Sequence, residues 1–216
     1  MMKKSKRSDV DPFIVMDVME SARIAEEKGK DIIHMEVGQP GTPAPKIAKD
    51  YITNEINKNN LGYTVSLGLP ALRTKISKLY GDWYNLDLNP NRIVVTTGSS
   101  GAFILSFSAL FDSGDRVGIG SPSYPSYRQI LKSLSLETVD IQTKLQNRFQ
   151  PVPEDITNNN LNGILVASPA NPTGSMLDKQ SLENLINTAN ENNVSFISDE
   201  IYHGIQYENN PTSALE

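Results

Sequence analysis

Cysteine is absent from this chain of 216 residues, which excludes disulfides and thiolate metal sites. A long apolar run is also missing. The longest stretch, residues 102–111, contains two serines and is too short to span a bilayer. Basic residues are in deficit: 20 lysines and arginines face 25 aspartates and glutamates, with a pI of about 5.1. This balance argues against a nucleic-acid-binding surface.

The first seven residues are basic, but the apolar core of a secretory signal does not follow them. We therefore expect a cytoplasmic protein that uses neither a nucleic acid nor a membrane as its partner. Its length suits one large domain, or one and a half small ones, with ample material for an apolar core.

Apolar β-branched runs alternate with segments whose apolar residues recur at helical spacing. Strands are predicted at 32–37, 92–97, 116–119, 137–141, 163–167 and 194–198. Helices are predicted at 12–28, 45–56 and 70–84. Three further helices are predicted: one begins at residue 102, another ends at about residue 134, and the last includes residues 182–189. This alternation indicates the α/β class, with a doubly wound, mostly parallel sheet flanked by helices.

Polar groups follow two of these predicted strands. Asp199 stands where the last strand ends, and Asn171 lies in Asn-Pro-Thr-Gly just after the strand at 163–167. Ligands of open α/β sheets bind at the carboxyl ends of strands. Asp199 could therefore be a metal ligand, a general base or the partner of a protonated ring nitrogen. Taken alone, it could equally be a solvated acidic residue that ends a strand.

A turn of small residues, Gly98-Ser99-Ser100-Gly101, separates the predicted strand at 92–97 from a helix. The free amides and the dipole of a helix start favour an anion, most often a phosphate. Many turns of this composition bind nothing, so the motif is only moderately specific.

Two further positions are candidates for ligand contact. Tyr124 follows the predicted strand at 116–119, where its ring could cover a flat ligand or simply pack on the surface. Gly38 follows the predicted strand at 32–37, where a glycine could admit a ligand or serve only as a turn residue.

Together these residues resemble the class I/II aminotransferases, which are fold-type I pyridoxal-phosphate enzymes. The resemblance runs from Asp9 to about Tyr207. It is carried by Tyr63 with Gly68 and Leu72-Arg73, by Thr97-Gly98-Ser99-Ser100-Gly101-Ala102, by Ser121-Pro122-Ser123-Tyr124, by Asn171-Pro172-Thr173-Gly174, and by Ser198-Asp199-Glu200-Ile201-Tyr202. The Asn-Pro-x-Gly and Asp-Glu-x-Tyr motifs at this separation form a specific pair.

The resemblance implies that the chain binds pyridoxal 5'-phosphate and moves an amino group between an α-amino acid and a 2-oxo acid. Asp199 would face the pyridine nitrogen and favour its protonated form. The other implied cofactor contacts are Asn171 and Tyr202 to the phenolic oxygen, Tyr124 to the ring face, and Gly98, Ser99 and Ser100 to the phosphate. Tyr63 would reach the phosphate of a neighbouring subunit, which implies a homodimer. Gly38 and Asn171 would lie near the substrate.

One departure from the family pattern concerns catalysis. The Schiff-base lysine of the family follows the Asp-Glu-x-Tyr motif in a Ser-x-x-Lys context, and this sequence ends at Glu216 without it. Lys179 begins a helix and does not replace it. We therefore expect no catalytic residue in this chain, and an aminotransferase fragment that is inactive alone.

The same reasoning sets the expected domain organisation. Residues 1–40 would form an N-terminal segment, and residues 41–216 an incomplete large cofactor-binding domain. In the family, two later strands separate the run at 92–97 from the strand at 163–167. Without them, we expect the run at 92–97 to lose its sheet neighbours and to expose apolar residues.

Other functions remain open on the sequence. A β-lyase or a cyclopropane-forming synthase would keep the scaffold and the cofactor but change the reaction. A non-catalytic remnant would bind only phosphate or a partner subunit. An ordinary nucleotide-binding domain is less compatible, because Gly98–Gly101 lacks the spacing of the common nucleotide loops.

Overall fold

The computed structural model describes residues 3–207 and 209–216, which form two compact units. The smaller unit is Pro12–Leu69. The larger unit combines the residues up to Asp11 with Pro70–Glu216. Residue 40, the predicted domain boundary, lies within the smaller unit. The division into a short N-terminal segment and a large domain stays a prediction.

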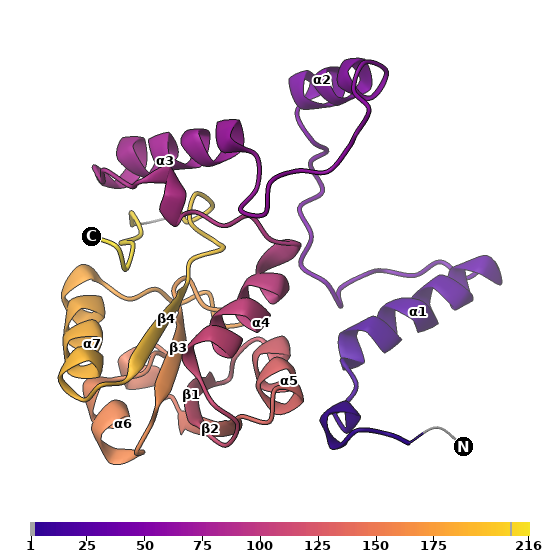
Figure 1. Cartoon of the computed structure of the whole chain (residues 1–216). Helices are drawn as coiled ribbons and strands as arrows, with labels where there is room; N and C mark the ends of the chain where they lie inside the picture. Colours follow the sequence, from indigo (N-terminus) through magenta and orange to yellow (C-terminus); the bar gives the residue numbers. More distant parts are fainter. Residues whose placement is uncertain (1–2, 208) are drawn as a thin grey trace. The chain divides into compact units, whose positions relative to one another are not determined.

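The larger unit contains a four-stranded sheet with the strand order β2-β1-β3-β4 (Figure 1). The strands are β1 (Arg116–Ser121), β2 (Glu137–Gln142), β3 (Gly163–Ala167) and β4 (Ser195–Asp199). All three pairings are parallel. Parallel strands need a crossover connection, and at least one helix connects each strand to the next. This arrangement confirms the predicted α/β fold class.

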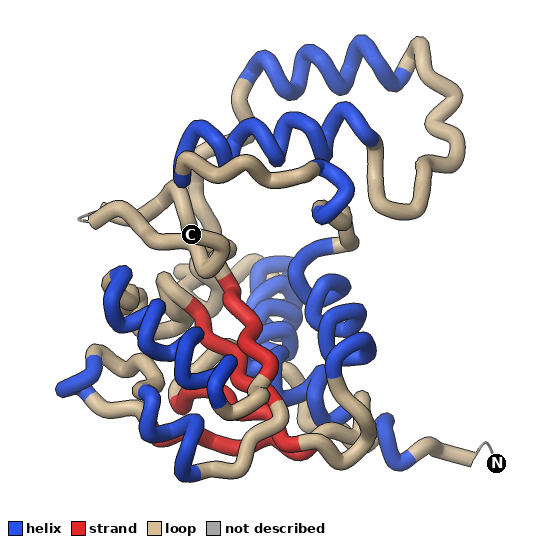
Figure 2. Tube along the Cα trace, turned by 60° about the vertical axis from the view of Figure 1, so that its left-hand side comes forward, coloured by secondary structure: helices blue, strands red, loops and turns tan. Residues whose placement is uncertain are grey.

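Helices cover both faces of the sheet (Figure 2). The larger unit contains α3 (Pro70–Tyr84), α4 (Gly98–Leu110), α5 (Pro125–Ser133), α6 (Pro153–Asn158) and α7 (Lys179–Glu191). Three short 3-10 helices are Lys6–Ser8, Pro90–Arg92 and Leu145–Asn147. Within the described residues, no helix is both long enough and apolar enough to cross a membrane.

The central strand β3 is buried on both faces, which explains its continuous apolar sequence. Ile164 and Val166 pack into one apolar cluster with side chains from α6 and α7. Leu165, between them, points to the opposite face and packs with side chains from α4 and α5. Side chains alternate along a strand, so three consecutive residues serve two cores.

Two predicted strands are wrong. Residues 32–37 form a loop in which Ile33 and Met35 are more than four-fifths exposed. Residues 93–96 follow the 3-10 helix Pro90–Arg92 and pair with no strand in the described part of the chain, and Val94 is 52% exposed. The β-branched composition of both runs suits a strand, but a strand also needs a neighbour. That this run loses partners supplied by two later strands stays a prediction.

Two helices differ from the prediction for local reasons. Gly98-Ser99-Ser100-Gly101, predicted as a turn before a helix, forms the first turn of α4 itself. The short helix α6 was not predicted. Its start is marked by Pro153 in its first turn and by Asp155, whose carboxylate accepts a hydrogen bond from the Val152 amide at 2.8 Å.

The smaller unit contains α1 (Ile14–Glu27) and α2 (Lys46–Ile56). Both leave apolar side chains exposed, among them Ile14, Ile47 and Tyr51. Its main polar cluster centres on His34. Nδ1 of His34 lies 2.7 Å from Glu36, and Nε2 lies 2.9 Å from Glu26. Both nitrogens can donate only when the ring is protonated.

We expect His34 to titrate near pH 9. Its hydrogen bonds to Glu36, and then to Glu26, raise its pKa from the ordinary value of 6.5 to about 9. The pKa is raised in the folded state, so the contribution to stability is fully present below pH 6.5 and is lost as the pH rises through 9. NMR titration of the two histidines measures the midpoint. Glu36→Gln should lower it, and a wild-type midpoint near 6.5 would contradict the contact.

Candidate active site

The candidate site begins where β3 and β4 end side by side. Ala167 pairs with Asp199 in the parallel register, so the segments that follow both strands leave the sheet at the same edge. The Ser168 amide donates to the carbonyl oxygen of Asp199 at 3.1 Å. Farther along, Nδ2 of Asn171 donates to the hydroxyl oxygen of Tyr202 at 3.2 Å. The structure thus brings together Asn171 of one predicted motif with Asp199 and Tyr202 of another.

Asp199 is a buried carboxylate with protein partners on both oxygens. It is 8% exposed. Oδ1 accepts from the Ile201 amide at 3.1 Å, and Oδ2 accepts from the Tyr127 hydroxyl at 2.5 Å. A buried carboxylate needs such donors because burial alone penalises its charge. The two bonds therefore keep the position and orientation of the carboxylate fixed.

Tyr127 is a residue of the candidate site that the motifs did not reveal. It lies on α5 and is 2% exposed, and its ring meets Tyr124 edge-on with centroids 5.5 Å apart. It also meets Phe103 of α4 edge-on at 5.2 Å. Burial, followed by the hydrogen bond to Asp199, raises the pKa of Tyr127, so its hydroxyl stays protonated and donates. Tyr127 thereby links Tyr124, α4 and Asp199.

The start of α4 is suited to an anion. Thr97 stands at the N-cap but makes no side-chain hydrogen bond to the first turn, which contains Gly98, Ser99 and Ser100. The first amides of a helix have no partner within the helix, and its dipole is positive at this end. Gly98 has a φ of +73°, a left-handed conformation that suits glycine.

Two predicted site residues lie in the smaller unit. Tyr63 is fully exposed, and a Cβ built at Gly38 would meet no atom within 4 Å. Their roles at a cofactor or a substrate stay predictions.

Every lysine of the sequence is exposed in the structure. Lys179, the lysine considered above, points its Nζ to Oε2 of Glu216 at a distance of 3.2 Å. The described residues therefore place no buried lysine beside Asp199.

Comparison with known proteins agrees with this geometry. The sequence profile of the family described as "Aminotransferase class I and II" matches residues 30–215. The chain is 40% identical over 210 residues to a valine–pyruvate aminotransferase of Mycobacterium tuberculosis, covering 96% of this chain and 54% of that protein. It is 34% identical over 206 residues to an aspartate aminotransferase of Thermotoga maritima, covering 93% of this chain and 54% of that protein.

Solved structures give the same result. A putative aminotransferase from Silicibacter pomeroyi has 58% sequence identity and a TM-score of 0.89, covering 99% of this chain and 55% of that one. An aminotransferase from Mycobacterium tuberculosis has 39% sequence identity and a TM-score of 0.92, covering 99% of this chain and 56% of that one. The chain thus spans about half the length of the relatives it matches. It belongs to the class I and II aminotransferase family.

Proposed function

We propose that these residues are the cofactor-binding part of an aminotransferase that moves an amino group between an α-amino acid and a 2-oxo acid. Class I and II aminotransferases use pyridoxal 5'-phosphate. When bound and protonated on its ring nitrogen, this cofactor withdraws electrons from the α-carbon of the substrate. The residues of this chain would bind and orient it.

The observation that carries the proposal is the environment of Asp199. Its buried carboxylate is held by Tyr127 and the Ile201 amide, at the sheet edge where ligands of such folds bind. A carboxylate fixed in this way favours a protonated ring nitrogen as its partner, because an opposite charge nearby stabilises the charged form.

The remaining donors also fit the cofactor in chemical type. The hydroxyl of Tyr202 and the amide of Asn171, joined at 3.2 Å, suit an oxygen on the ring. The start of α4, with Gly98, Ser99 and Ser100, suits a phosphate. The ring of Tyr124 would cover one face of the cofactor. These groups all belong to the larger unit.

Several finer features belong to the same proposal. The named relatives are a valine–pyruvate aminotransferase and an aspartate aminotransferase, and the substrate class common to both names is an α-amino acid. Gly38 and Asn171 would contact that substrate. Tyr63 would reach the phosphate of a second subunit in a homodimer, which would be cytoplasmic.

We expect the 216-residue chain to bind pyridoxal 5'-phosphate without catalysing transamination. Binding requires only the groups described above, whereas transamination needs a lysine amine at the cofactor, and all lysines here are exposed. Equilibrium dialysis measures binding, and a coupled assay with several amino-acid donors measures turnover. Pyridoxal, which lacks the phosphate, is the matched control and should bind more weakly. Failure to bind the phosphorylated cofactor would refute the proposed site, and sustained turnover would refute the expected inactivity.

A further inference from the structure

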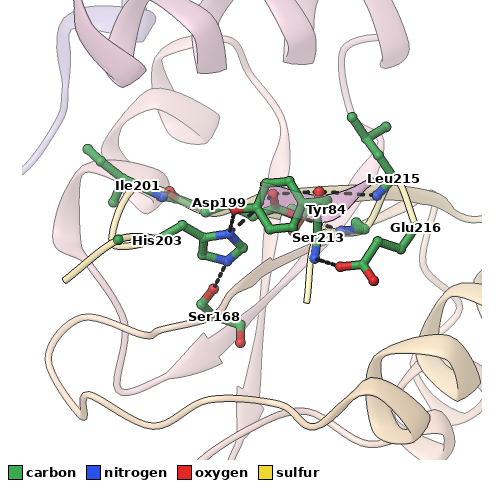
Figure 3. A network of polar contacts seen from close by, with 12 residues as sticks. Tyr84, Ser168, Asp199, Ile201, His203, Ser213, Leu215 and Glu216 are labelled. Carbon is green, nitrogen blue, oxygen red and sulfur yellow. Dashed lines mark hydrogen bonds and ion pairs between the residues drawn. The ribbon is translucent and has the colours of Figure 1, made fainter. Parts of the chain in front are cut away.

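His203 is a buried histidine to which none of the roles above has been given. Its side chain is 5% exposed, and both ring nitrogens have partners (Figure 3). Nε2 lies 2.9 Å from the backbone carbonyl oxygen of Ser168, and Nδ1 lies 2.5 Å from the hydroxyl oxygen of Tyr84. A carbonyl oxygen can only accept, so Nε2 carries a proton and donates it. In the neutral ring, Nδ1 then accepts from Tyr84.

The bond to Ser168 joins the two segments that carry the site. His203 directly follows Tyr202, and Ser168 opens the turn that contains Asn171. Asn171 and Tyr202 are therefore connected twice. Their own side chains meet at 3.2 Å, and their backbones are tied through His203 and Ser168.

Tyr84, the last residue of α3, fixes the other side of the ring. Burial, followed by the negative charge of Glu200, raises the pKa of Tyr84 to about 12, so its hydroxyl is protonated at neutral pH and can donate. The two rings are also in contact, with centroids 5.8 Å apart. Glu200 lies 3.8 Å from Nδ1. Contacts on both sides hold the imidazole with Nε2 directed at Ser168.

We propose that His203 is a positioning residue for the cofactor, which holds the turn at 168–171 against the turn at 199–203. In this way it keeps Asn171 and Tyr202 at the spacing at which both contact the ring oxygen of the cofactor. The inference rests on the proposed function. His203 itself touches neither cofactor nor substrate, because protein groups occupy both of its nitrogens.

The test compares His203→Leu with His203→Gln in the whole chain, with pyridoxal 5'-phosphate as the probe. Leucine cannot donate to Ser168, whereas the amide nitrogen of glutamine can. We expect His203→Leu to bind the cofactor about tenfold more weakly, the effect of roughly one hydrogen bond. We also expect the absorbance of the bound cofactor to titrate at a different pH, since Asn171 and Tyr202 would no longer be aligned with its ring oxygen. His203→Gln should restore both properties.

Ile156→Val serves as the matched control for a general loss of stability. Ile156 lies on α6 in the apolar core and takes no part in the hydrogen bonds of His203. Its variant should bind the cofactor with wild-type affinity and spectrum. Wild-type binding by both His203 variants would overturn the inference and leave the proposed function standing. Weak binding by His203→Gln as well as by His203→Leu would also overturn the inference. A side chain that can donate to Ser168 would then hold the cofactor no better than one that cannot. A wild-type chain that binds no cofactor would overturn both.

Discussion

Asp199→Asn is expected to weaken the binding of pyridoxal 5'-phosphate by about 10- to 100-fold, the usual range for losing a charge-assisted hydrogen bond. The asparagine keeps the shape of the side chain, and its carbonyl oxygen can still accept from Tyr127. The change removes the negative charge that would pair with a protonated ring nitrogen. It also removes the acceptor for the Ile201 amide, because the amide nitrogen of asparagine only donates. The fold should therefore persist while affinity, measured by equilibrium dialysis, falls.

Asp140→Asn is the matched control for this experiment. Asp140 lies on β2 and pairs with Arg128 at the surface, away from the end of β4. The same chemical change there should leave the affinity for the cofactor unchanged. Equal affinity in wild type and Asp199→Asn would show that the cofactor does not bind against this carboxylate.

Gly163→Ala is expected to destabilise the fold by about 1–3 kcal/mol, the usual cost of overpacking a core, because the partly buried ring of Phe111 must shift. A Cβ at this position would lie 2.2 Å from Cζ and 2.5 Å from Cε1 of Phe111. Gly163 begins the central strand and pairs with Val117 and Ser195, so its backbone cannot retreat without disturbing two neighbours. Urea denaturation measures the loss.

Gly81→Ala provides a control of the opposite sign. Gly81 lies inside α3, and its added Cβ would meet only the Leu86 carbonyl oxygen at an ordinary 3.5 Å. Alanine favours a helix over glycine by about 1 kcal/mol, so this variant should be slightly more stable than wild type. A Gly163→Ala chain as stable as wild type would mean that Phe111 does not pack over the strand as described.

Segments whose own residues decide their structure were predicted well. The strand at 163–167 and the helix at 70–84 match β3 and α3, because an apolar run buried on two faces and a long helical stripe are both evident in the sequence. The runs at 32–37 and 92–97 were predicted wrongly from equally suitable residues. Among the described residues neither run has a neighbouring strand, and a segment's own composition does not reveal its neighbours.

The site shows the same contrast. Asp199 and Asn171 were predictable because each follows a recognisable strand, and parallel strands end at a common edge. Tyr127 and His203 were not given roles. The hydrogen-bond partner of Tyr127 is 72 positions away, and the carbonyl that His203 contacts is 35 positions away. Only folding shows that these polar side chains are buried and paired.

The parallel sheet has a consequence for the timing of assembly. Arg116 pairs with Glu137, Val117 with Gly163 and Gly163 with Ser195, and each pairing closes around at least one intervening helix. Such distant pairings form slowly compared with local contacts. On a ribosome, β4 emerges after the other three described strands and delivers Asp199 as its last residue. A nascent chain could therefore offer Asp199 to the cofactor only after β4 has paired with β3, so that cofactor capture would report the formation of this pairing.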